Sequence, residues 1–248
     1  MYYSCSELSE GNIVFVDTPA LFADMLGYFE QAKPDVVGLD CEWKPIFDVD
    51  DSIVESVNDN VEQHNKKNRP STLQIATRHK VFVVETKHLV DVLDEPLLHK
   101  FGELILFSER LVKLGYGFDQ DGKKLANSFT IFKYKFANFV EDVVNMDVVA
   151  SECAKMSEKV FDTEAKSQCD ALANSSKPKG LSKLTMICLG KPLDKRECMS
   201  NWDNKPLRRA QLIYAALDAL VLIKIHEFIQ NKCKELNINF NYTNKSLV

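Results

Sequence analysis

Residues 36–43, which read Val-Val-Gly-Leu-Asp-Cys-Glu-Trp, constrain this chain more than any other stretch. An apolar, β-branched run of this length is typical of a central β-strand. Because side chains alternate between the two faces of a strand, Asp40 and Glu42 project to one side, and Cys41 and Trp43 to the other. Two carboxylates at such a short distance repel each other unless a cation lies between them. The stretch therefore indicates a divalent metal site or, alternatively, an ordinary strand end that reaches solvent.

The composition is that of a globular protein. The chain has 248 residues, of which 45% are apolar, enough to bury a core in one large domain or two small ones. There is no basic and apolar leader and no apolar run near the length of a bilayer, so we expect an intracellular protein without a membrane anchor. Seven cysteines without a C-x-x-C pair argue for reduced thiols rather than disulfides or structural zinc.

The net charge of −5 excludes a protein that grips nucleic acid through bulk positive charge. Any contact with phosphate must be local. A solvated surface is the commoner interpretation of a small basic cluster. The clusters that can contact phosphate are Lys66, Lys67 and Arg69; Lys123 and Lys124; Lys177, Lys179 and Lys183; and Arg208 and Arg209.

Alternating strand and helix patterns predict an α/β protein. A helix follows the Thr18-Pro19 pair, another restarts near Pro96, and residues 143–150 form a strand or a helix. Predicted strands lie at 13–16, 36–43, 72–76, 81–84 and 111–117, and later helices at 181–189 and 211–236. Polar, aperiodic insertions are expected at about 46–70 and 155–179, and flanking segments at 1–11 and 233–248.

Two further acidic groups accompany Asp40 and Glu42. Asp119 and Asp121 open the helix that follows the 111–117 strand, where Asp119 suits an N-cap and Asp121 can point into a cleft. Tyr214 and Asp218 are four residues apart and share one face of a mostly apolar, buried helix. A buried aspartate needs a partner. The alternative interpretation of Tyr214 is a core tyrosine.

Together these residues resemble a known family. Asp40-Cys41-Glu42, Gly117 to Asp121 with Leu125, and Tyr214 to Asp218 resemble, in order, the three exonuclease motifs of the DEDD superfamily. The histidine branch of that superfamily has His where this chain has Ile213, so the tyrosine branch is the match. The pattern favours Asp121 for the second motif because a Leu follows it four residues later, with Asp119 as the alternative.

The segments 71–76 and 200–207 also resemble this family, and the likeness covers about residues 12–232, which we expect to form a single exonuclease domain. The two insertions depart from the family pattern. Residues 40–45 and 201–218 look closest to Nibbler-type exonucleases, which trim the 3′ ends of small RNAs, and next to Werner-type exonucleases.

The resemblance implies a ribonuclease-H-like mixed β-sheet with α-helices on both faces. It also implies a site for two Mg²⁺ or Mn²⁺ ions. Asp40, Glu42 and Asp218 would hold the ion that activates water, Asp121 would act on the second ion through water, and Tyr214 would orient the attacking water. The implied reaction is hydrolysis of single-stranded small RNA from its 3′ end, releasing nucleoside 5′-monophosphates.

Several predictions rest on the resemblance with less residue-level support. Trp43, Phe118 and Trp202 are candidates for stacking on terminal bases, although each reads more readily as core. Gln74 and Lys183 are further candidates for substrate contact. Partner proteins in a small-RNA silencing pathway would follow from the Nibbler likeness. The competing interpretations are a Werner-type DNA exonuclease and a degenerate nuclease fold that serves as a binding module for RNA or protein.

Overall fold

The computed structural model describes residues 2–4, 8, 10–45, 69–156, 160, 180–239, 242–243 and 246–247. The insertion predicted at 46–70 lies outside the described residues except for its last two. The insertion predicted at 155–179 also lies outside the described residues, except for residues 155, 156 and 160.

The centre of the fold is a mixed six-stranded sheet with the order β1-β4-β3-β2-β5-β6. β3 runs antiparallel to both of its neighbours, and the remaining pairs are parallel. Each predicted strand is present. The bounds are β1 (Ile13–Val16), β2 (Val36–Glu42), β3 (Thr72–Ala76), β4 (Val81–Glu85), β5 (Val112–Gly115) and β6 (Val143–Asn145).

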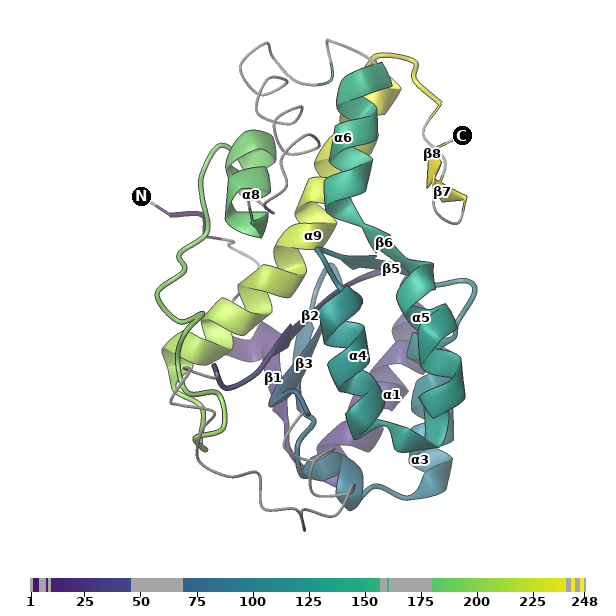
Figure 1. The fold of residues 1–248 in the computed structure, drawn as a ribbon, viewed down its shortest axis with the longest axis vertical. Coiled ribbons are helices and arrows are strands. Elements are labelled where there is room, and N and C mark those ends of the chain that lie inside the picture. Colours follow the sequence, from purple (N-terminus) through teal and green to yellow (C-terminus); the bar gives the residue numbers. More distant parts are fainter. Residues whose placement is uncertain are drawn as a thin grey trace, which may run out of the picture.

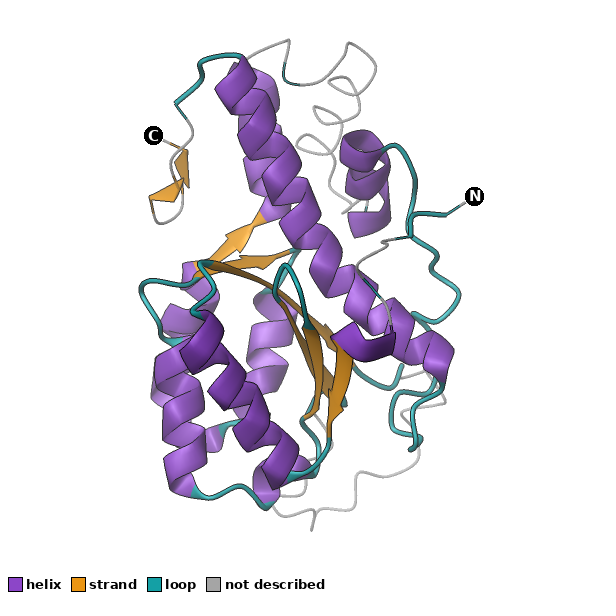
Figure 2. Cartoon of the chain, turned by 180° about the vertical axis from the view of Figure 1, so that it is seen from behind, coloured by secondary structure: helices purple, strands orange, loops and turns teal. Residues whose placement is uncertain are grey.

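Helices cover both faces of this sheet, as the family resemblance implies (Figures 1 and 2). The long helix α9 (Arg209–Glu235) crosses the strands on one face, where α6 (Met146–Met156) and α8 (Leu181–Leu189) pack against it. The other face carries α1 (Pro19–Ala32), α3 (Glu95–Phe101), α4 (Asp119–Ser128) and α5 (Phe136–Asp142). Shorter elements are 3₁₀ turns at Glu10–Asn12, Leu89–Asp91 and Thr130–Lys135, a π-helical turn at Gly102–Leu106, and the strand pair β7 (Tyr242–Thr243) and β8 (Ser246–Leu247).

Local sequence signals place most of these boundaries. The Thr18 hydroxyl accepts a hydrogen bond from the Leu21 amide at 3.3 Å, which caps α1 as the Thr-Pro pair predicts. The Asp94 carboxylate caps α3 in the same way, with Pro96 in the first turn. Residues 143–150, predicted as either a strand or a helix, contain both: β6 ends at Asn145, and α6 follows directly.

One prediction of a helix cap is wrong. Phe118 occupies the N-cap position of α4, and Asp119 is the first helical residue rather than the cap. The positive φ of Gly117 (60°) turns the chain sharply before the helix, so α4 begins one residue earlier than an Asp119 cap allows.

Helix α9 is buried over most of its length. Its residues from Ala215 to Ile223 are all buried, which confirms the predicted core helix. Among the described residues, no helix combines the length and apolar character needed to cross a bilayer.

Gly38 sets the distance between α9 and the central strand β2. A Cβ atom added to Gly38 would lie 2.0 Å from the backbone oxygen of Ala219 on α9. Glycine inside a strand often marks such a close backbone approach. Any side chain at residue 38 would therefore push α9 away from β2.

Replacing Gly38 by alanine should destabilise the protein by about 2 kcal/mol or more, because the helix or the strand must shift to admit one methyl group. Gly27→Ala is the matched control: a Cβ at Gly27, in the middle of α1, meets nothing within 4 Å. That substitution should stabilise the fold by up to about 1 kcal/mol through helix propensity. Urea denaturation measures both, and equal stability of Gly38→Ala and the wild type would contradict the close approach.

Candidate active site

Three carboxylates meet where β2 ends beneath α9. Asp40 and Glu42 project from β2 on the face that α9 covers, and Asp218 descends from α9. One oxygen of each of these three side chains lies within 4.8 Å of the others. Asp218 is far from Asp40 and Glu42 in the sequence, so the fold is what brings these three side chains together.

The close approach at Gly38 explains this meeting. Asp218 immediately precedes Ala219, whose backbone oxygen faces Gly38, and Asp40 lies two residues beyond Gly38 on the same face of β2. The contact that fixes the helix on the strand therefore also fixes Asp218 beside Asp40.

Burial and mutual repulsion hold the carboxyl groups toward their protonated forms. Burial, together with the charges of Asp218 and Asp121, raises the pKa of Asp40 well above its usual value. Burial and the charge of Asp40 raise the pKa of Glu42 to about 10, and burial raises the pKa of Asp218. Strongly shifted carboxyl groups gathered in one place are typical of functional sites.

Asp121 approaches this group from α4, while Asp119 does not. The Asp121 side chain is buried, and burial raises its pKa to about 7. Its charge also raises the pKa of Asp40, whereas Asp119 is exposed on the first turn of α4. The burial of Asp121 and its effect on Asp40 favour Asp121 over Asp119, although Asp121 stands outside the group of three oxygens, so its role stays a prediction.

Tyr214 lies one helical turn before Asp218. Its ring packs against the fully buried Trp202, with 5.9 Å between ring centroids. Burial and the charges of Asp218 and Glu42 raise the pKa of the Tyr214 hydroxyl, so it stays protonated at neutral pH. The hydroxyl is thus a hydrogen-bond donor beside the carboxylates.

Lys195 is a member of the site that sequence reasoning missed. Its ammonium donates to Asp218 Oδ2 at 2.8 Å and to the Tyr214 hydroxyl at 3.3 Å. It comes from the irregular connection between α8 and α9, and no motif singles it out there. Only the folding back of that connection places Lys195 against α9.

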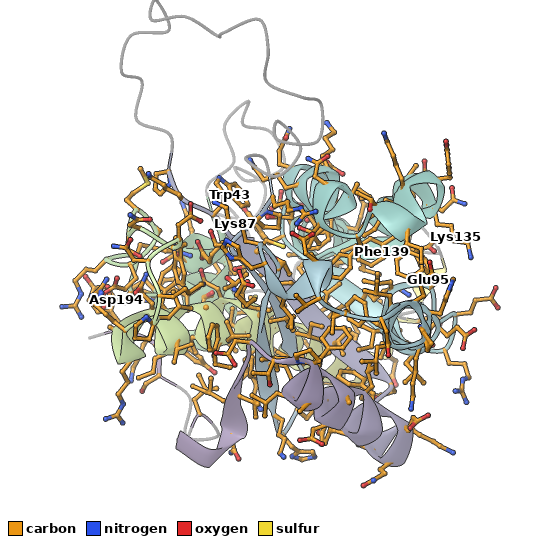
Figure 3. The ribbon with its side chains drawn as sticks, turned by 90° about the horizontal axis from the view of Figure 1, so that it is seen from below. Trp43, Lys87, Glu95, Lys135, Phe139 and Asp194 are labelled. Atoms are coloured by element: carbon orange, nitrogen blue, oxygen red, sulfur yellow. The ribbon has the colours of Figure 1, made fainter. Side chains whose placement is uncertain are left out.

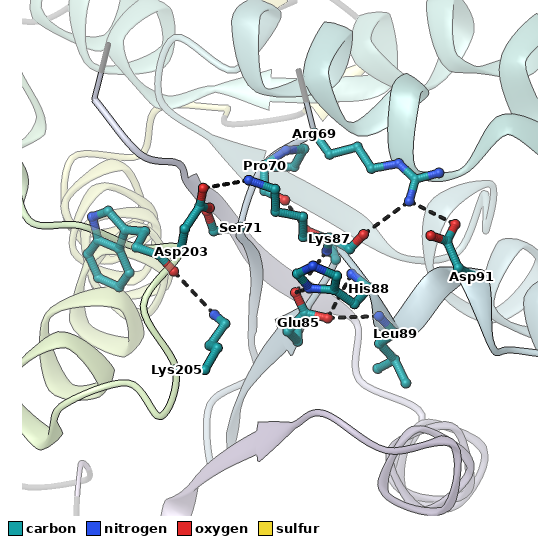
Figure 4. A network of polar contacts seen from close by, with 12 residues as sticks. Arg69, Pro70, Ser71, Glu85, Lys87, His88, Leu89, Asp91, Asp203 and Lys205 are labelled. Atoms are coloured by element: carbon teal, nitrogen blue, oxygen red, sulfur yellow. Dashed lines mark hydrogen bonds and ion pairs between the residues drawn. The ribbon is translucent and has the colours of Figure 1, made fainter. Parts of the chain in front are cut away.

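Asp203 is a second residue that sequence reasoning missed. Its carboxylate accepts a hydrogen bond from the Ser71 hydroxyl at 2.5 Å and pairs with the Lys87 ammonium (Figure 4). The Ser71 amide in turn donates to the Glu42 carbonyl at 2.7 Å. Asp203 therefore ties the connection before α9 to the backbone of β2. A signal for this tie exists in the sequence, since segments 71–76 and 200–207 both belong to the resemblance.

The predicted substrate contacts receive uneven support. Trp202 and Gln74 are fully buried, Gln74 donates to the Thr72 hydroxyl at 2.7 Å, and Phe118 is also in the core. These three side chains are packed in the interior of this structure, and their contact with a substrate stays a prediction. Trp43 is half-buried directly after the end of β2, with the Lys124 ammonium 4.9 Å from its ring centre, and Figure 3 shows it on the same side as Lys87. Lys183 is half-buried on α8.

The donor atoms of the site suit a hard divalent cation. Carboxylate oxygens are the ligands that Mg²⁺ and Mn²⁺ prefer. Asp218 Oδ1 is buried and accepts no hydrogen bond from the described residues. A buried acceptor without a donor is unfavourable, and a cation among the three carboxylates would satisfy it.

Comparison with known proteins agrees with this geometry. The model of a family described as 3′-5′ exonuclease matches residues 13–234. The chain belongs to this 3′-5′ exonuclease family. It is 30% identical over 205 residues to the exonuclease mut-7 homolog of Homo sapiens, a match that covers 81% of this chain and 20% of that protein. The chain thus spans about a fifth of the length of that relative.

Solved structures carry the same fold. The Nibbler EXO domain of Aedes aegypti superposes with a TM-score of 0.68 at 21% identity, covering 96% of this chain and 95% of that one. Escherichia coli RNase D superposes with a TM-score of 0.58 at 15% identity, covering 91% of this chain and 46% of that one. These matches confirm the predicted ribonuclease-H-like fold and the resemblance to Nibbler-type exonucleases.

The crowded carboxylates of this exonuclease should make its metal-free form less stable as pH rises. The pKa of Glu42 is about 10 in the folded protein against an ordinary 4.5, so the unfolded chain releases a proton that the folded protein keeps. Folding stability therefore falls as pH rises above about 5. Glu42→Gln removes the part of this dependence that Glu42 contributes, and in EDTA at pH 8 it should melt higher than the wild type by about 3 °C or more.

The difference between Glu42→Gln and the wild type should shrink toward pH 5. The buried His226, whose pKa is lowered to about 4, favours stability at higher pH, but it is present in both proteins and cancels in the comparison. Glu109→Gln, at an exposed position, is the control for the loss of one negative charge. Differential scanning calorimetry across this pH range decides the matter: a variant that melts below the wild type at pH 8 would rule out carboxylate strain.

Proposed function

We propose that this exonuclease is a metal-dependent 3′-5′ exoribonuclease that shortens single-stranded small RNA by a two-metal mechanism and releases nucleoside 5′-monophosphates. The observation that carries the proposal is the meeting of Asp40, Glu42 and Asp218 within 4.8 Å, with the Tyr214 hydroxyl one helical turn away. This arrangement occurs in a chain whose family is that of 3′-5′ exonucleases.

Asp40, Glu42, Asp218 and Asp121 are the residues that would hold two Mg²⁺ or Mn²⁺ ions. Bound divalent ions supply positive charge that lowers the pKa of an attacking water and stabilises the leaving oxygen. The orphaned oxygen of Asp218 and the raised pKa values of its neighbours support this assignment, because both are relieved by added positive charge.

Tyr214 would position the attacking water. Its hydroxyl remains protonated because burial and the neighbouring carboxylates raise its pKa, so it donates a hydrogen bond and does not act as a base. Its ring is fixed by packing against Trp202, which holds the hydroxyl at one place relative to Asp218.

RNA is the proposed substrate on the strength of the relatives. RNase D of Escherichia coli is described as an exoribonuclease involved in structured RNA processing, and the Nibbler EXO domain has the more similar fold. Partner proteins in a small-RNA silencing pathway belong to the same proposal and rest on the mut-7 and Nibbler likeness alone.

The two alternatives differ in what they require of the site. A Werner-type DNA exonuclease would use the same carboxylates, because these do not contact the sugar. A binding module derived from a nuclease would have no use for four converging acids, which destabilise the fold and repel phosphate. The intact acidic group therefore favours an enzyme over the binding module.

Asp218→Asn should abolish cleavage while leaving the protein folded, because it replaces one metal ligand and relieves repulsion. Asp121→Asn should slow cleavage by about a hundredfold or more, whereas Asp119→Asn should stay within about twofold of the wild type. The measurement is a timed digestion of 5′-labelled and 3′-labelled single-stranded RNA with Mg²⁺, Mn²⁺ or EDTA. Full activity of Asp218→Asn, or wild-type cleavage in EDTA, would refute the metal site.

The sugar can be tested with matched oligonucleotides. The 2′-hydroxyl is the group that lets a protein distinguish RNA from DNA at one nucleotide. We expect RNA to be cut faster than DNA of the same sequence, and a 2′-O-methyl group on the terminal ribose to slow cutting, because it removes a donor and adds bulk. Equal rates on RNA and DNA, with no effect of the methyl group, would move the proposal to a DNA exonuclease.

A further inference from the structure

We propose that Lys195 is a positioning residue of this exonuclease: its ammonium stands in for a divalent ion on Asp218 in the metal-free protein and holds the Tyr214 hydroxyl as a hydrogen-bond acceptor. This inference rests on the function proposed above and adds a residue to it.

The first contact is an ion pair whose acidic member is buried. Lys195 Nζ lies 2.8 Å from Asp218 Oδ2; the Asp218 side chain is only 6% exposed, and that of Lys195 is 37% exposed. The charge of Lys195 also opposes part of the rise in the pKa values of Asp40 and Glu42. Lys195 thus offsets part of the repulsion that the metal-free site would otherwise carry.

The second contact fixes a proton. An ammonium group has three donors and no acceptor, so the Tyr214 oxygen must accept the hydrogen bond from Lys195 at 3.3 Å. The hydroxyl proton of Tyr214 is then directed away from Lys195, toward the carboxylate side. The ammonium also lies 5.2 Å from the centre of the Tyr214 ring, a cation–π contact that holds it over Tyr214 independently of Asp218.

The segment that carries Lys195 is held in place. Leu193 is buried in the core beside α9, and its carbonyl accepts a hydrogen bond from the Ser182 hydroxyl at 3.1 Å. The preceding carboxylate, Asp194, is paired with Arg196, so it does not neutralise Lys195. Figure 3 places Asp194 at the side of the molecule opposite Lys135. The ammonium is therefore delivered to Asp218 by fixed backbone rather than by a loose surface side chain.

These contacts have opposite consequences for metal binding and for turnover. In the metal-free site the ammonium is attracted to the Asp218 carboxylate, and this attraction weakens once divalent ions are bound to the same carboxylate. Lys195 therefore stabilises the metal-free form relative to the loaded form and weakens metal affinity. At the same time its hydrogen bond to Tyr214 supports catalysis, so its removal should slow turnover.

The experiment compares Lys195→Met with Lys195→Arg, which keeps the charge, and with Lys191→Met, which removes an exposed cation from the same connection. Three quantities are measured for each variant. Isothermal titration calorimetry gives the Mn²⁺ affinity. The melting temperature is recorded in EDTA and in saturating Mn²⁺, and kcat is measured on single-stranded RNA at saturating Mn²⁺. Lys195→Met should bind Mn²⁺ about tenfold more tightly and turn over about tenfold more slowly. It should also melt below the wild type in EDTA but not in Mn²⁺. Lys191→Met should match the wild type, and Lys195→Arg should keep near-wild-type Mn²⁺ affinity.

If Lys195 had only a structural role, the variants would behave differently. If folded Lys195→Met binds Mn²⁺ no more tightly than Lys191→Met, the stand-in role is wrong, and if kcat is unchanged, the role at Tyr214 is wrong. Lys195→Gln, whose amide remains polar, serves the same comparison if the Met variant does not fold in EDTA. Failure of the wild type to bind Mn²⁺ or to cut RNA would instead contradict the proposed function itself.

Discussion

The repulsion among buried carboxylates is the constraint on which the rest of this structure depends. Asp40, Glu42 and Asp218 stand together where burial alone already opposes their ionisation, so their meeting must be enforced by other contacts. The enforcing contact is the packing of α9 on the sheet. The buried apolar length of α9, from Ala215 onward, supplies the favourable burial that holds Asp218 in place.

In the same packing, one glycine determines both how closely α9 lies on the sheet and where the carboxylates of the site meet. Gly38 lets the backbone of α9 approach β2 so closely that a methyl group would not fit, and it does so two residues before Asp40 and opposite the residue that follows Asp218. A small shift of the helix would therefore separate the carboxylates. Sites that need this precision are better carried on strands and helices than on loops, and Asp40, Glu42, Tyr214 and Asp218 all lie on such elements.

Sequence predicts the parts of this site that follow from local periodicity. The alternation of a strand places Asp40 and Glu42 on one face, and the spacing of a helix places Tyr214 above Asp218, so both pairs are predictable from residue spacing alone. The strand and helix order, and with it the α/β class, follow from the same patterns. The predicted N-cap of α4 is wrong because the sharp turn at Gly117 shifts the helix start by one residue.

Long-range placement is what local patterns cannot supply, and the connection between α8 and α9 shows why. It has little regular structure, yet it brings Trp202 against Tyr214 and Lys195 onto Asp218. Its position is fixed by side-chain ties such as that of Asp203 to Ser71, which join residues 132 positions apart. No periodicity encodes such a tie. Sequence reasoning therefore missed Lys195, the residue that offsets charge in the site, because its place there depends on where the connection returns and not on how each segment folds.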